Sequence, residues 1–110
     1  MRFLCLAYGD EAGWNPLSEE DKQDAHSHDQ VIRERGTLMS AVRPAVTSVR
    51  NRDKQLVIRD EAYARHDLPL AGFSVIEAVS LDDVIKLVSN TPCARGVIEI
   101  RPFWQSTNSQ

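Results

Sequence analysis

Residues 3–8 have the sequence Phe3-Leu4-Cys5-Leu6-Ala7-Tyr8, and this stretch decides the fold. It is a short apolar run that Gly9-Asp10 brings to an end, so it predicts a β-strand. Successive side chains of a strand point to opposite faces, and here both sets are apolar. A strand that is apolar on both faces belongs at the centre of a sheet that is covered on both sides.

Caps and breakers divide the rest of the chain into further elements. Ser18 precedes three acidic residues and predicts a helix N-terminus, and Ser80 with Asp83 predicts another. Gly36 is expected to end the first helix in a left-handed conformation. Residues 9–16 are expected to form a loop, and residues 51–54 a four-residue link between two hairpin strands. The predicted order is a strand at 3–8, a helix from 19 to about 35, a strand at 37–42, a hairpin at 45–50 and 55–59, a strand at 70–79, a helix from 81 that ends before Thr91-Pro92, and a strand at 97–100.

This order predicts an α+β fold of the ferredoxin-like type, βαβ-(hairpin)-βαβ, in one domain over residues 1–104. The hairpin is expected to be an appendage to the sheet, and residues 105–110 a polar tail. Two helices cover only one face of a four-stranded sheet. A second subunit packed sheet to sheet is the simplest cover for the other face, so we predict a homodimer.

Composition excludes several classes of protein. The formal charge of −3 and the absence of a run of basic residues argue against nucleic-acid binding. No apolar stretch reaches the roughly 20 residues that span a bilayer, and the apolar N-terminal run is too short for a signal peptide. These features predict a cytoplasmic protein without a membrane partner. Cys5 and Cys93 do not form a CxxC pair and are expected to be buried or inert thiols.

Three blocks of sequence, in order, resemble the YCII-related family. The first is residues 3–11 followed by Trp14, the second is Leu70-Ala71-Gly72-Phe73, and the third is residues 92–96 with Glu99-Ile100-Arg101-Pro102. The resemblance is to the large branch that is named for its DGPFAETKE motif, and it extends along nearly the whole chain. It implies a dimeric α/β barrel with a cleft near the subunit interface that binds a small molecule.

The chain departs from that branch at its named motif. The DGPFAETKE segment aligns with residues 60–68, where only Asp60 and Ala64 are identical and Tyr63 replaces the Phe. The family's proposed acid–base pair is a helix histidine and an aspartate that precedes a proline. Those positions hold Ala25 and Thr91 here, so the pair is absent from its usual places.

The first helix contains two histidines that are close in sequence, and such residues can be metal ligands. His26 and His28 are two residues apart, so their side chains point about 200° apart and cannot bind one ion from the same turn. We therefore predict no metal site, and no sequence motif indicates a cofactor. His28 is expected to lie between Ala25, Val31 and Ile32 on the side of the helix that meets the sheet. It is either a proton carrier in the family's cleft or a partly buried side chain that makes one hydrogen bond.

The connection at residues 60–67 holds the most polar cluster outside the helices, and functional residues collect on such loops. It is equally compatible with a solvated connection. The residue types suit proton transfer and the binding of an anionic group. The candidate catalytic residues are His28, His66 and Asp60, and the candidate ligand-binding residues are Tyr8, Tyr63, Arg95 and Arg101.

Two functions remain open on this evidence. The first is a cofactor-free acid–base enzyme that acts on a small organic acid or ring compound. The second is a non-catalytic dimer that binds a small ligand or a partner protein. A contact between a histidine and Asp60 or Asp67 inside a concavity would favour the enzyme.

Overall fold

Four antiparallel strands form one sheet in the order β2–β5–β1–β6. A computed structural model describes residues 1–64, 66–89 and 96–104 of the chain. Within these ranges β1 (Arg2–Gly9) is an inner strand, paired with β5 (Leu70–Glu77) on one side and β6 (Gly96–Pro102) on the other. The edge strand β2 (Gly36–Ala41) pairs with β5. The central position predicted for residues 3–8 is confirmed, and so is the α+β, ferredoxin-like fold.

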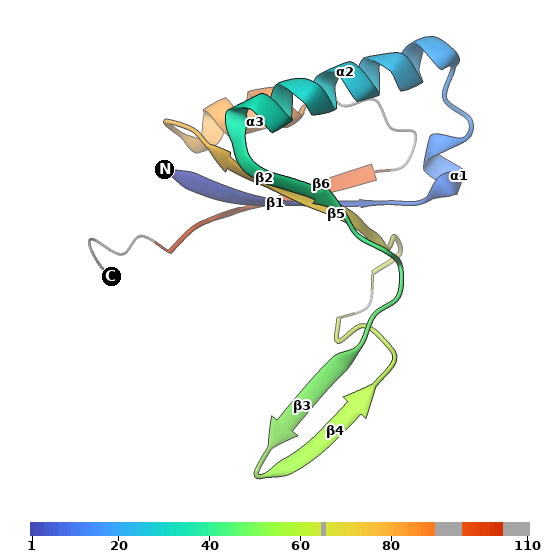
Figure 1. The fold of residues 1–110 in the computed structure, drawn as a ribbon, viewed down its shortest axis with the longest axis vertical. Helices are drawn as coiled ribbons and strands as arrows, with labels where there is room; N and C mark the ends of the chain where they lie inside the picture. The colour runs from blue at the N-terminus through green and yellow to red at the C-terminus, as the bar shows by residue number, and fades with distance from the viewer. Residues whose placement is uncertain (65, 90–95, 105–110) are drawn as a thin grey trace.

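Two helices, α2 (Glu19–Arg35) and α3 (Leu81–Val88), lie on the same face of the sheet (Figure 1). Both begin at the predicted caps. The Ser18 hydroxyl accepts a hydrogen bond from the Asp21 N–H at 3.0 Å, and the Ser80 hydroxyl accepts one from the Asp83 N–H at 3.2 Å. Such caps satisfy backbone donors that have no partner inside the helix.

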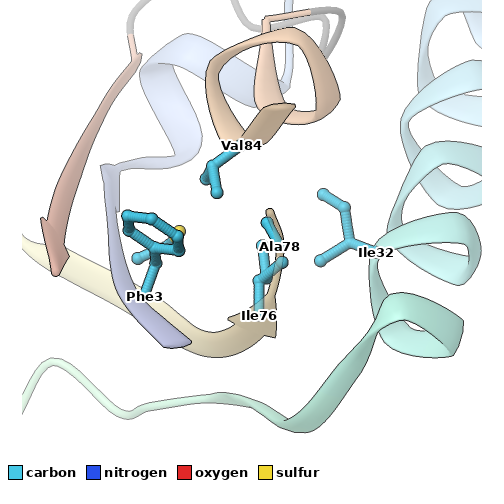
Figure 2. Packing of buried hydrophobic residues seen from close by; sticks show 6 residues of the cluster. Phe3, Ile32, Ile76, Ala78 and Val84 are labelled. Carbon is cyan, nitrogen blue, oxygen red and sulfur yellow. The ribbon is translucent and has the colours of Figure 1, made fainter. Parts of the chain in front are cut away.

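The core lies between the sheet and these helices. Figure 2 shows how side chains from β1, α2, β5 and α3 meet there. They include Phe3, Ile76 and Val84, which are fully buried. The buried cluster consists of Phe3, Cys5, Ile32, Ile76, Ala78 and Val84. Of the two cysteines, Cys5 is buried as predicted and burial raises its pKa, whereas Cys93 lies outside the described residues.

Gly36 does not adopt the predicted left-handed conformation. Its φ of −102° and ψ of 169° are extended, and it already belongs to β2. The reason for a glycine is a close approach of two backbones. A Cβ at this position would lie 2.6 Å from the Val75 carbonyl oxygen and 3.3 Å from the Ile32 carbonyl oxygen.

Two further local predictions need correction. The loop predicted at residues 9–16 contains a short helix, α1 (Glu11–Trp14), where the Asp10 carboxylate accepts a hydrogen bond from the Gly13 N–H at 3.1 Å. The hairpin strands are β3 (Ser48–Arg52) and β4 (Gln55–Arg59), so the link is two residues long rather than four. Asp53 and Lys54 form it with positive φ values of 52° and 62°. A two-residue turn with positive φ at both positions matches the twist of the two strands. The sequence lacks the glycine that usually indicates such a turn.

The face of the sheet opposite the helices has no cover within the described chain. Its side chains are apolar at the centre, and we call it the open face, defined by Leu4, Leu6, Leu38, Phe73 and Val75. Leu38 is 54% exposed and the other four are half-buried. The hairpin forms a separate two-stranded sheet, as predicted, and projects on the side of the open face (Figure 1). Among the described residues, no helix is long and apolar enough to span a membrane.

Candidate functional site

A cavity of about 710 Å³ lies between the helices and one end of the sheet, and we call it the helix–sheet cavity. The end of β1, α1, α2, the C-terminal end of α3 and the start of β6 all contribute to its lining. Ala25 lines it. The polar side chains that line the cavity include three carboxylic acids, those of Asp10, Glu11 and Asp29. A volume of this size suits a small organic ligand.

Asp29 is the carboxylic acid that α2 presents to this cavity. It lies one turn after Ala25, on the same side of the helix. Burial raises the pKa of Asp29, and the charges of His26, His28 and Arg33 oppose that shift only in part. Asp29 therefore keeps its proton to a higher pH than an exposed carboxyl group does.

Trp14 forms an aromatic wall of the same cavity. Its ring meets the His26 ring edge to face, with 5.5 Å between the ring centroids. Lys22, on the same helix as His26, places its ammonium 5.9 Å from the centroid of the Trp14 indole, a distance at which a cation is attracted to the ring. These contacts with α2 hold the indole of α1 in place at the cavity.

A second concavity of about 1000 Å³ lies between the base of the hairpin and the end of the sheet, and we call it the hairpin cleft. Tyr8 lines both concavities. Its hydroxyl donates a hydrogen bond to the Glu99 carboxylate at 3.2 Å, and the Arg101 guanidinium donates to the same oxygen at 3.2 Å. Burial and the neighbouring Glu99 raise the pKa of Tyr8, which keeps its hydroxyl protonated. The ring of His66 packs on the Tyr8 ring with centroids 4.8 Å apart.

Neither a family model nor a curated protein matches the sequence. A solved structure does match the fold. It is 5-chloro-2-hydroxyhydroquinone dehydrochlorinase from Burkholderia phenoliruptrix AC1100, in complex with 2,5-dihydroxybenzoquinone. The match covers 98% of this chain and 97% of that chain, with 16% sequence identity and a TM-score of 0.51. The two chains share a fold. At this identity the likeness shows the ferredoxin-like architecture and nothing about activity.

The structure brings four of the predicted site residues together. Tyr8, Tyr63, His66 and Arg101 all line the hairpin cleft. Their functional roles stay predictions. Arg95 lies outside the described residues, as do Thr91, Arg65 and residues 105–110.

The other two predicted residues line neither concavity. Asp60 is exposed on the connection after β4. His28 is half-buried on α2, and its Nε2 atom is buried without a hydrogen-bond partner in the described part of the chain. Within the described part of the chain, no hydrogen bond joins Asp60 or Asp67 to His28 or His66. These residues therefore do not form the histidine–carboxylate contact that is expected of the enzyme.

Asp29 is the residue that the sequence interpretation missed. The sequence spacing could have indicated Asp29, because it follows Ala25 by four residues. Ala25 and Asp29 therefore lie on the same side of the helix. His28 was preferred because its residue type suits proton transfer. Within the described ranges, no group of three or more His, Cys, Asp or Glu side chains is arranged to hold a metal ion.

Proposed function

We propose that this protein is a YCII-related homodimer that binds a small hydroxylated ring compound in the helix–sheet cavity. The observation that supports it most directly is the combination of a cavity of about 710 Å³, the Trp14 wall and the Asp29 carboxyl group. The three ordered sequence blocks and the shared fold support the family assignment. The uncovered apolar centre of the open face supports the homodimer.

The lining of the cavity favours a ring with hydroxyl groups over a carboxylate ligand. Carboxylates accept hydrogen bonds when ionised and repel anions, and three of them line this cavity. An indole offers its face to a planar ring, which stacks on it in an offset or edge-on arrangement. The dehydrochlorinase of similar fold was solved with 2,5-dihydroxybenzoquinone, a hydroxylated ring of similar size that is more acidic than a simple phenol.

Calorimetric titration with hydroxylated rings that are neutral at pH 7, such as hydroquinone and hydroxyhydroquinone, tests the binding proposal. Asp29→Asn removes a charged hydrogen-bond acceptor and should weaken binding by on the order of tenfold or more. The matched control is Asp24→Asn, an exposed acid on the same helix that does not line the cavity, and its affinity should equal that of the wild type. Equal affinities in all three proteins would refute the proposed location of the ligand.

A second candidate function is acid–base catalysis on the bound ring, and the raised pKa of Asp29 favours it. In this function Asp29 takes a proton from a ring hydroxyl or returns one to the ring. Product formation from the same compounds, followed by absorbance, should then be lost in Asp29→Asn and retained in Asp24→Asn. Binding without turnover by any compound of the series would leave the protein a non-catalytic binder.

The hairpin cleft is an alternative place for a ligand, and its lining suits an anion. His66, Arg43 and Arg101 line it together with the Tyr63 phenol. The imidazole, guanidinium and phenol groups can each donate a hydrogen bond to an anion. Small carboxylates should bind the wild type more tightly than His66→Ala, which removes one of these donors. If His66→Ala instead lowers the melting temperature and leaves binding unchanged, His66 has a structural role on the Tyr8 ring.

A further inference from the structure

The β3–β4 hairpin has one apolar face and one basic face. Val49 pairs with Ile58 across the strands and Asn51 pairs with Leu56, so the three apolar side chains share a face. Val49 is 64% exposed, and Leu56 and Ile58 are each 61% exposed. The opposite face presents Arg50, Arg52 and Arg59, together with Ser48, Gln55 and Val57.

The hairpin makes no strand pairing with the rest of the described chain. It is tied to the following connection by side-chain contacts, including a hydrogen bond from the Ser48 hydroxyl to the Glu61 carbonyl. An isolated two-stranded hairpin is at best marginally stable in water, because it buries little apolar surface. A hairpin with an exposed apolar face therefore needs a surface to pack on.

The position of the hairpin identifies the side on which that surface lies. Helices α2 and α3 lie above the sheet in Figure 1, and the hairpin projects below it. The hairpin cleft connects the hairpin to the sheet. It is lined by residues 42–48 at the base of the hairpin and by Tyr8, Leu70 and Arg101 at the end of the sheet. Whatever covers the open face thus lies beside the hairpin.

Charge indicates what this occupant is. Residues 43–59 contain five basic side chains and one acidic side chain, a formal charge of +4, which leaves −7 on the rest of a chain whose total is −3. The body of a second copy therefore attracts the hairpin over distances of several ångströms. A second copy also presents its own apolar open face. In a two-fold symmetric dimer, each contact of one hairpin with the partner is repeated by the partner's hairpin. The same two surfaces, the hairpin and the body, are therefore used by both protomers.

We infer that the β3–β4 hairpin is an arm that packs against a second copy of this chain, with Val49, Leu56 and Ile58 on its buried side. This inference rests on the proposed homodimer and adds a second contact region to the open face. The basic side of the arm, with Arg50, Arg52 and Arg59, faces away from that contact. The arm then stabilises the dimer while leaving the fold of each protomer intact.

Sedimentation equilibrium on matched variants tests the arm. Leu56→Ser/Ile58→Ser removes two apolar side chains from the inferred buried face of each protomer, and it should raise the dimer dissociation constant at least tenfold. The control is Val57→Ser, which lies between them in β4 and points to the other face. It should raise the constant less than threefold. Equal effects of the two variants, or none, would overturn the inference.

Amide hydrogen exchange on the unmodified protein gives an independent test. Amides of residues 48–59 should exchange slowly well above the dimer dissociation constant and rapidly well below it. A wild-type protein that is a monomer at micromolar concentration would contradict the proposed homodimer itself. A wild-type dimer whose arm stays unprotected would contradict only the arm. Protection that appears only on adding phosphatidylserine vesicles would also overturn the inference, because it assigns the arm to a membrane surface.

Discussion

At the scale of single residues, Asp29 links the cavity to the stability of the fold. Burial raises its pKa, so the folded state holds the proton more tightly than the unfolded state, whose carboxyl group titrates near the ordinary value of 3.8. Stability from this group is therefore present at pH values below 3.8 and is lost as pH rises through the folded-state pKa. Asp29→Asn cannot ionise, so it should melt at a higher temperature than the wild type at pH 7 and lose that advantage in acid. Thermal melts between pH 3 and 8 measure this, and a variant less stable than the wild type at pH 7 would contradict it.

At the scale of elements, the junction between α2 and β2 depends on the missing side chain of Gly36. A methyl group there meets two backbone carbonyls, one from β5 at 2.6 Å and one from α2 at 3.3 Å, and neither can turn away. Gly36→Ala should therefore destabilise the protein by about 1–3 kcal/mol, the usual cost of overpacking. Denaturant titration measures the loss. Ser27→Ala on the exposed side of α2 is the control and should differ from wild type by less than about 0.5 kcal/mol. A Gly36→Ala protein as stable as this control would show that the helix and strand separate easily.

At the scale of the whole molecule, the open face is expected to be the centre of the dimer. Leu38 is 54% exposed on it, so a charge there costs the isolated protomer little but lies in an apolar interface when two sheets pack. Leu38→Glu should give a monomer mass by light scattering at micromolar concentration, where the wild type gives a dimer mass. Val31→Glu is the control, because Val31 is 47% exposed but belongs to the helix layer. If Leu38→Glu remains as dimeric as Val31→Glu, the open face is not the interface.

The order of the elements, apart from the short helix α1, and the central place of β1 could both be predicted from the sequence. Both follow from local rules. Alternation shows that the two faces of residues 3–8 are apolar, and a serine before acidic residues satisfies the first backbone donors of each long helix. The sequence also pointed to the region around Tyr8, Tyr63, His66 and Arg101 through a resemblance to known proteins, and these residues do share one cleft.

The tertiary structure alone decided the roles of Gly36, the hairpin turn and Asp29. The space around Gly36 is limited by Val75, which is distant in sequence, so no local pattern reports it. Asp53 and Lys54 adopt positive φ values because two strands must meet in register, and lysine is not a residue that favours that conformation. Asp29 has its raised pKa because separate elements bury it together, and burial is a property of the packed molecule rather than of its neighbours in the chain.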